Sequence, residues 1–476
     1  MTARSRLALW GGPAGFALAW LLLPSGGDLN QAALAGTAWW MLWWWIGGAV
    51  PIGPTSLLPL ALFPAFGVMD LPTAATPFGS KFIWLFLGGF VLALALERHG
   101  LHRRFALHLL RRLGGGPRRT VFGFMLATAL LSMWISNTAT TLMMLPMAVA
   151  VLGLLEEQGG PRPWGSALIL GVAYGANTGG MATLVGTPPN AALAGVASDR
   201  FGVDIGFVEW MQVGVPVSAA VLLAVFGLLV MLHRIPRGEG SQGGGEVVRA
   251  ELEKLGAITA AERRVLLLFA STAFLWMLRR PLNALLVETG FQFNDTSVAV
   301  AAAIACFACP ASAEGRSGER LLAADDLRSL PWDILLLFGG GLALAKGFEM
   351  AGWAAVLADH AAGLGWAPAA MLILVTAMGL FATELMSNLA LTLLLTPVAG
   401  ALAIGMGVHP LYFAAPVALA SSGAFMLPMA TPPNAIVFSS GRIRMADMAR
   451  IGLVLNLATL AIVLLLWWQL APGEWR

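Results

Sequence analysis

Two short polar motifs each occur twice within apolar sequence. Ser-Asn stands at residues 136–137 and 387–388, and Thr-Pro-Pro-Asn stands at 187–190 and 431–434. Hydroxyl and amide groups supply oxygen atoms that bind cations and N–H donors that bind anions. Polar motifs that repeat in the same order within apolar sequence indicate a binding site made from two related halves, as in secondary transporters.

The chemistry of these motifs suits a cation beside an anion. Side-chain oxygens and the carbonyls of a broken helix suit a hard monovalent cation such as Na⁺, while the unpaired N–H groups that begin a helix attract anions. A bound Na⁺ would lower the cost of desolvating a carboxylate. The alternative is that Ser-Asn only caps a broken helix. Repetition of both motifs in register argues against that alternative.

The duplication extends beyond these motifs. One offset of 251 residues separates Gly88 from Gly339, Ser136 from Ser387 and Pro146 from Pro397, and the two Thr-Pro-Pro-Asn motifs are 244 residues apart. A shared offset across several features predicts an internal repeat.

Composition sets the class of protein. The 476 residues are 58% apolar and 11% charged, and soluble domains carry roughly 25% charged residues. We therefore expect an all-α polytopic membrane protein of about 11 transmembrane helices, in two inverted five-helix repeats that each hold a re-entrant hairpin and a broken helix. A nucleic-acid partner is not expected.

The expected segment boundaries follow from the positions where the sequence should interrupt a helix. Ser-Asn divides a long apolar stretch into arms too short to cross a ~30 Å hydrocarbon core, and paired prolines interrupt a helix. The expected organisation is a first span at 1–34, a first repeat at 35–233 with a hairpin at 120–155 and a broken helix at 164–197, a cytoplasmic linker at 234–264, and a second repeat at 265–476 with a hairpin at 368–404 and a broken helix at 411–440.

Basic residues predict the orientation. They concentrate in loops such as 98–119 and 442–450, and cytoplasmic loops carry the excess of Lys and Arg. The N-terminus is then cytoplasmic and the C-terminus outside, in a bacterial inner membrane. The first hairpin would enter from the cytoplasmic side and the second from the outer side.

Glu384 is a carboxylate within the second apolar hairpin, three residues before Ser387. A carboxylate at membrane depth is a functional candidate. Orientation of the tip by hydrogen bonding is the favoured role, and proton relay is the alternative. The first hairpin has Met133 at the matching position, so this feature is not symmetric.

Residues 132–140, the second Ser-Asn, both Thr-Pro-Pro-Asn motifs, Phe86–Phe90 and Leu101–Arg104 resemble the divalent anion–sodium symporter family, which includes INDY-like bacterial dicarboxylate transporters. The resemblance implies a homodimer that moves its substrate by an elevator-type shift. It implies sodium-coupled import of C4-dicarboxylates such as succinate, malate and fumarate. A sodium-independent exchanger, or a sulfate or citrate transporter on the same fold, is the alternative. An enzyme is not expected, since the spans lack the hydrolase motifs His-Glu-x-x-His and Gly-x-Ser-x-Gly.

The resemblance also assigns site residues. The first sodium site would use Ser132, Ser136, Asn137 and the carbonyl of Gly186. The second would use Thr383, Asn388 and carbonyls near Met386 and Ala430. Substrate carboxylates would meet Asn137, Thr138, Thr187, Pro188, Asn388, Thr431 and Pro432.

Two positions depart from the family pattern. Leu389 stands where relatives often have Thr, which predicts one hydroxyl contact fewer and a change in substrate preference. Gly47-Gly48 stands where the family commonly has Thr-Glu, and we draw no prediction from it.

Overall fold

The computed structural model describes residues 3–22, 29–113, 116–159, 164–237, 243–312, 319–363 and 365–475. Within these ranges the regular structure is helical, apart from an isolated bridge between Pro310 and Arg320. This confirms the predicted all-α class.

The helices follow in chain order. They are α1 (Ala3–Leu22), α2 (Leu29–Gly47), α3 (Ile52–Thr55), α4 (Leu58–Ala65), α5 (Leu71–Ala75), η1 (Thr76–Gly79), α6 (Lys81–Arg98), α7 (Leu101–Leu113), α8 (Pro117–Ser132), α9 (Asn137–Gly159), α10 (Gly165–Gly180), α11 (Pro188–Phe201), α12 (Phe207–Leu232), α13 (Gly243–Leu255), α14 (Ala260–Leu285), η2 (Val287–Thr289), α15 (Asp295–Ala308), η3 (Ala324–Ser329), α16 (Trp332–Met350), α17 (Trp353–Gly363), α18 (Pro368–Ala382), α19 (Asn388–Gly405), α20 (Leu411–Ser421), α21 (Pro432–Phe438), α22 (Met445–Leu470) and η4 (Gly473–Trp475).

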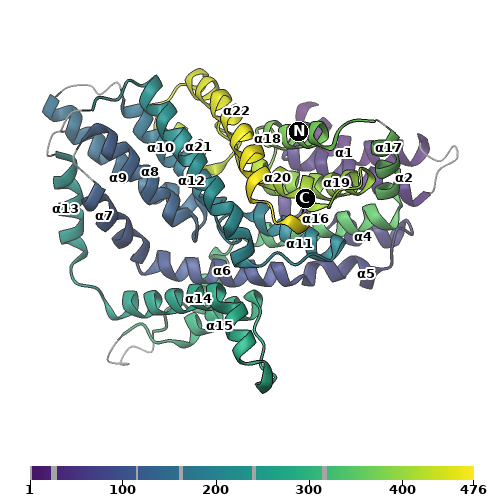
Figure 1. The fold of residues 1–476 in the computed structure, drawn as a ribbon, viewed down its shortest axis with the longest axis horizontal. Coiled ribbons are helices and arrows are strands. Elements are labelled where there is room, and N and C mark those ends of the chain that lie inside the picture. Colours follow the sequence, from purple (N-terminus) through teal and green to yellow (C-terminus); the bar gives the residue numbers. More distant parts are fainter. Residues whose placement is uncertain are drawn as a thin grey trace.

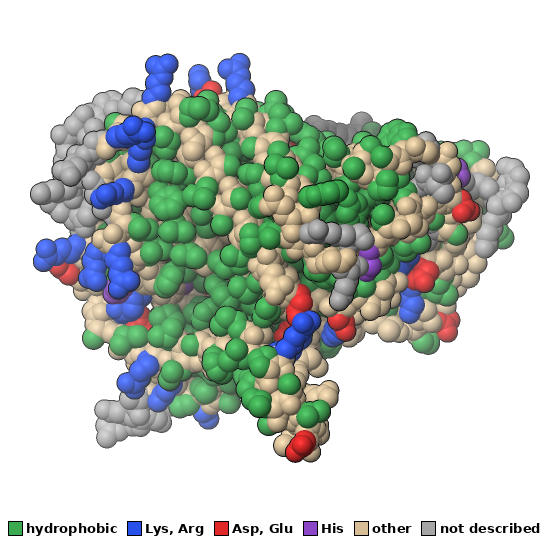
Figure 2. Space-filling view, viewed as in Figure 1, with side chains coloured by type: hydrophobic (Ala, Val, Ile, Leu, Met, Phe, Trp, Pro, Cys, Tyr) green, Lys and Arg blue, Asp and Glu red, His purple; other side chains and the backbone are tan. Residues whose placement is uncertain are grey.

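Six helical segments in the described ranges are long and apolar enough to cross a membrane. They are Leu71–Arg98, Asn137–Glu157, Phe207–Leu232, Ala260–Leu285, Asn388–Gly405 and Met445–Leu470. Hydrophobic side chains cover much of the middle of the molecular surface, whereas Lys and Arg gather at the end where α7, α9 and α13 lie and along the adjoining edge (Figure 2). The chain is thus a membrane protein. The count of eleven spans stays a prediction.

The helices divide between two ends of an elongated molecule. Figure 1 shows α8, α9, α10 and α12 at one end and α1, α2 and α17 at the other, with α22 crossing between them. Close packing joins α8 to α10 in the first half and α18 and α19 to α20 in the second. Each hairpin therefore packs on the broken helix that follows it.

The helices break where the repeated motifs stand. The tip at 133–136 separates α8 from α9, and the tip at 383–387 separates α18 from α19. The first joint, defined here as residues 181–187, separates α10 from α11, and the second joint, residues 422–431, separates α20 from α21. The paired prolines occupy the first turns of α11 and α21, where the missing N–H groups remove no helical hydrogen bond.

A stripe of glycines brings α10 close to α8. A Cβ placed on Gly175 would lie 2.7 Å from the carbonyl oxygen of Met125, and one on Gly179 would lie 2.1 Å from that of Ala129. Only glycine fits such an approach of two backbones, as at other small-residue interfaces between membrane helices. The first arm of the hairpin is therefore interlocked with the broken helix.

The expected cytoplasmic linker contains helix α13, which packs on α7 and α9. At its end Arg104 Nε bonds Glu262 Oε1 at 2.8 Å, and Arg104 Nη1 bonds the carbonyl of Gly256 at 2.9 Å. The side chains of Arg104 and Glu262 are 13% and 4% exposed. The linker is thus docked on the first half rather than extended between the halves.

Candidate functional site

The first tip brings together side-chain and backbone oxygens. Ser132 Oγ donates to Asn137 Oδ1 at 2.5 Å. A Cβ placed on Gly180 would lie 2.7 Å from Asn137 Oδ1 and 3.2 Å from the carbonyl oxygen of Gly186. Three of the predicted ligands of the first sodium site, Ser132, Asn137 and Gly186, therefore meet beside Gly180.

The first joint is held by its own half. Asn190 Nδ2 lies 2.7, 3.1 and 3.2 Å from the carbonyl oxygens of Thr183, Gly180 and Met181. The Thr183 hydroxyl donates to the carbonyl of Met133 in the tip. One amide thus donates to three carbonyls at the break. Trp210 Nε1 also donates to the Met181 carbonyl, and the Gly186 N–H to that of Thr183, in line with the need of buried backbone groups for partners.

The second tip repeats the first with Thr383 in place of Ser132. The Thr383 hydroxyl lies 2.6 Å from Asn388 Oδ1 and 2.7 Å from the carbonyl oxygen of Ser421. Thr383 is buried and Asn388 is half-buried. The described contacts join Thr383 and Asn388 to Ser421, just before the second joint, which the sequence analysis did not single out.

The second joint is held from both halves. Asn434 Nδ2 donates to the carbonyls of Ala424 and Leu427, each at 3.1 Å. Asn177 of α10 reaches across, with its Nδ2 at 3.1 Å from both Ala424 O and Thr431 Oγ1 and 3.2 Å from Asn434 Oδ1. The hydroxyl of Tyr174 adds a bond to Phe425 O at 2.9 Å. A helix of the first half thus fixes the joint of the second.

Glu384 lies in the second tip and is 3% exposed. Its Oε1 accepts from the backbone N–H of Phe425 (2.8 Å) and Met426 (2.9 Å), and its Oε2 accepts from that of Leu427 (3.0 Å). Asn456 Nδ2 donates to Oε1 at 2.9 Å. The hydrogen-bonding role that the sequence suggested for Glu384 is present, and its backbone partners lie in the joint.

Packing brings the two halves to a common region. Helix α21 packs on α9 and α10, and α11 packs on α19 and α20. Each second half-helix therefore lies against the hairpin or broken helix of the opposite half.

The remaining predicted residues lie at the same breaks. Ser136 and Ser387 accept hydrogen bonds from the N–H groups of Ala139 and Ala390, at 3.2 and 3.5 Å. Both serines therefore also serve as helix caps, the alternative that the sequence raised. Thr138, Pro188 and Met386 are half-buried, Thr187, Ala430 and Thr431 are buried, and Pro432 is exposed. Their roles as ligands of Na⁺ or of the anion stay predictions.

Leu389 occupies the position of Thr138 in the repeat, but its surroundings differ. It is 4% exposed and belongs to an apolar cluster with Ala191 of α11 and Leu342 of α16. Thr138 is half-buried at the first tip. The Leu389 side chain is therefore part of the packing between helices.

The sequence analysis missed several residues that hold the site. These are Tyr174, Asn177, Thr183, Ser421 and Asn456. Asn177 and Asn456 carried a usable signal, because an amide side chain within an apolar helix marks a functional or structural contact. The partners of the other three depend on tertiary packing.

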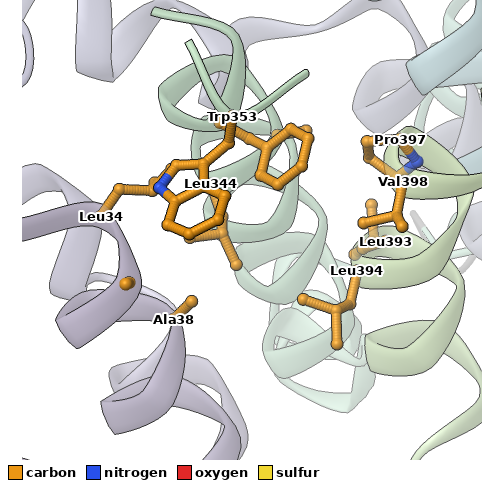
Figure 3. A pocket seen from close by; sticks show the side chains of 11 residues that line it. Leu34, Ala38, Leu344, Trp353, Leu393, Leu394, Pro397 and Val398 are labelled. Carbon is orange, nitrogen blue, oxygen red and sulfur yellow. The ribbon is translucent and has the colours of Figure 1, made fainter. Parts of the chain in front are cut away.

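An apolar cavity lies apart from the tips. Its lining comes from α2, α16, α17 and α19, with Leu34 and Ala38 facing Leu393 and Val398 across it (Figure 3). Its lining is apolar except for the indole N–H of Trp353, which donates to the Gln31 carbonyl, so it is poorly suited to replace the hydration of a dianion. We therefore assign the polar site to the tips and joints.

Comparison with known proteins gives consistent matches along the chain. A family profile described as sodium:sulfate symporter transmembrane region matches residues 14–471. A relative from Staphylococcus saprophyticus, described as sodium-dependent dicarboxylate transporter SdcS, is 36% identical over 453 residues, covering 94% of this chain and 87% of the relative. The protein of the same description from Staphylococcus aureus strain USA300 is 36% identical over 454 residues, covering 92% and 85%.

Two solved structures share the fold. The YdaH transporter of Alcanivorax borkumensis gives a TM-score of 0.51 at 15% identity, covering 82% of this chain and 88% of that one. MtrF of Neisseria gonorrhoeae, described with a class of antimetabolite efflux pumps, gives 0.54 at 13% identity, covering 85% and 84%. At these identities the likeness concerns the fold alone.

Proposed function

Because the chain belongs to the sodium:sulfate symporter family, we propose that it imports a C4-dicarboxylate, such as succinate, malate or fumarate, together with Na⁺. Membership in a family of transporters confirms the prediction of a transporter rather than an enzyme. It also confirms the resemblance found in the sequence.

The observation that carries this proposal is the pair of oxygen clusters at the tips. Ser132 and Asn137 meet near the Gly186 carbonyl, and Thr383 meets Asn388 and the Ser421 carbonyl. Hydroxyl, amide and carbonyl oxygens are the ligands of hard cations. One Na⁺ at each cluster would fit these donors.

The anion would lie between the two tips. Asn137 and Asn388 each begin a helix, α9 and α19, and helix N-termini and amide N–H groups stabilise negative charge. The tips at 133–136 and 383–387 contain no Lys or Arg. Neutralisation of a dianion would therefore depend on bound Na⁺, which gives coupling its physical basis.

For the transport cycle we propose an elevator-type shift in a homodimer. The interlocked glycines of α10 and the docking of each hairpin on its broken helix support movement of the site as one body. The dimer and its scaffold domain follow from the family resemblance.

We place the chain in a bacterial inner membrane with its N-terminus in the cytoplasm and its C-terminus outside. The gathering of Lys and Arg at one end of the molecule supports a cytoplasmic face there (Figure 2), in line with the excess of basic residues in cytoplasmic loops. Reporter fusions at each terminus test this orientation.

Uptake of labelled succinate into proteoliposomes tests the function directly. We expect accumulation with an inward Na⁺ gradient and little uptake when K⁺ replaces Na⁺. Equal uptake in both would contradict symport, and uptake that requires internal dicarboxylate would identify an exchanger. Absence of succinate uptake with active sulfate or citrate uptake would overturn the proposed substrate class.

A further inference from the structure

Glu384 makes contacts that no described residue of the first half reproduces. Its carboxylate accepts three consecutive backbone N–H groups of the second joint, at 2.8, 2.9 and 3.0 Å. The preceding residue, Thr383, contacts Ser421 O at 2.7 Å. One dipeptide of the tip therefore contacts residue 421, just before the second joint, and residues 425–427 within it.

The Glu384 carboxylate is buried, and the described part of the chain gives it no cationic partner. Ion pairs within 4 Å among the described residues do not include Glu384. Burial of a charge is expensive, and hydrogen bonds to the ionised form offset that cost. Glu384 is therefore a buried carboxylate that accepts four N–H donors, and it directly follows Thr383 of the second oxygen cluster in the sequence.

The first half lacks this arrangement. Met133 occupies the matching position, and its carbonyl accepts a bond from the Thr183 hydroxyl. Asn190 holds the first joint through carbonyls, whereas Glu384 holds the second through N–H groups. Any effect that depends on Glu384 should therefore be confined to the second half.

We propose that Glu384 is a positioning residue that sets the Na⁺ affinity of the second half. It fixes the joint against Thr383 and Asn388, so that the oxygens for the cation are already in place, and its negative charge favours a cation nearby. This inference rests on the proposed sodium coupling. It assigns to Glu384 no direct contact with the ion or the anion.

Glu384→Gln tests the proposal while keeping the size of the side chain. Its amide group must face either Leu427 N–H or the donors at Oε1, so at least one hydrogen bond and the charge are lost. The Na⁺ concentration for half-maximal uptake should rise by about tenfold, while uptake at saturating Na⁺ is largely retained. Hydrogen exchange at residues 425–427 should become faster.

Met133→Leu is the matched control at the equivalent position of the first tip. It should leave both the Na⁺ midpoint and the exchange of residues 425–427 unchanged. An unchanged Na⁺ midpoint in a folded Glu384→Gln protein would overturn the proposal. So would an equal shift in the Met133→Leu protein.

Asn456→Ala provides a second test should the Gln variant fail to fold. It removes the side-chain donor to Oε1 without altering the tip or the joint, and should raise the Na⁺ midpoint by roughly threefold. An unchanged midpoint would contradict the proposal.

Thermal stabilisation by Na⁺, measured without substrate, separates the two proposals. If the uptake rate of the wild-type protein does not depend on Na⁺, the proposed symport is contradicted. Wild-type protein stabilised by Na⁺, with Glu384→Gln stabilised at the same concentrations, contradicts the role of Glu384 alone.

Discussion

The two joints are built from the same Thr-Pro-Pro-Asn motif, yet different parts of the chain hold them. In the first, Asn190 donates to the carbonyls of Met181 and Thr183 in the joint and to that of Gly180 just before it. In the second, Asn434 binds two carbonyls, while Asn177 and Tyr174 from the first half and Glu384 from the tip supply the other contacts.

The two joints therefore share the position of the break but not the residues that support it. A broken helix leaves carbonyls without donors and N–H groups without acceptors. The first joint is supported mainly on the carbonyl side, and the second is supported on both sides. We therefore expect the first joint to depend on fewer residues and to be the more easily disrupted.

Loss of either tip amide should produce the largest effect. Asn137→Ala and Asn388→Ala each remove a group that contacts the hydroxyl of the oxygen cluster, so uptake of succinate should fall to background in both. Size-exclusion profiles should match those of the wild type. Uptake near the wild-type rate in one variant would show that the tip amide of that half is dispensable. It would contradict the view that both halves are needed for transport.

Gly179→Ala should disrupt the first half through packing. The added Cβ would lie 2.1 Å from the Ala129 carbonyl, and overpacking of this kind costs about 1–3 kcal/mol. A lower melting temperature in detergent is the expected result. Gly227→Ala in α12, where the added methyl meets no atom within 4 Å, is the control and should melt close to the wild type.

A comparison of the melting temperatures of the Asn190→Ala and Asn434→Ala variants tests the two joints directly. Asn190→Ala leaves the Gly180 carbonyl without a described donor, because Trp210 Nε1 and the Gly186 N–H still donate to the Met181 and Thr183 carbonyls. After Asn434→Ala, the Ala424 and Leu427 carbonyls both still accept, from Asn177 Nδ2 and the Ala430 N–H. Each unsatisfied buried group costs about 1–3 kcal/mol, so Asn190→Ala should lower the melting temperature more. Equal decreases in melting temperature would mean that the contacts of Asn177 with the second half contribute nothing to stability.

Thr138→Val and Leu389→Thr compare the paired positions after the two Ser-Asn motifs, with the smallest effects. Thr138→Val removes a hydroxyl from the half-buried first tip, and should raise the KM for succinate by roughly fivefold. Leu389→Thr places a hydroxyl in an apolar cluster, so it should lower stability and change KM by less than about twofold. A clear gain in affinity for succinate from Leu389→Thr would show that this position contacts the substrate, as the family pattern predicts.

The sequence predicted the breaks well because they have local causes. Proline pairs at 188–189 and 432–433 cannot continue a helix, and the Ser-Asn tips begin α9 and α19 where the motifs stand. The meeting of Ser132 with Asn137 also follows from the short turn between them.

Contacts between distant segments could not be predicted in the same way. The bonds of Asn177 to Thr431 and of Tyr174 to Phe425 join residues about 250 positions apart, and no local pattern fixes which helices pack together. The burial of the Leu389 side chain could not be predicted either. The sequence does not show which face of a helix packs against the rest of the protein until the neighbouring helices are known. The helix in the linker, α13, was missed because the segment is rich in glycine and charge, although Val248, Leu252 and Leu255 recur at helical spacing and pack on the core.

The glycine stripe of α10 has a consequence for the bilayer around the protein. Gly175 and Gly179 hold the backbones of α8 and α10 so close that neither helix can slide on the other without separating. Any movement of the first half must carry Ser132, Asn137 and the Gly186 carbonyl together. Changes in lipid thickness or lateral pressure should therefore alter how fast the cycle turns over, and leave unchanged the number of cations carried with each anion.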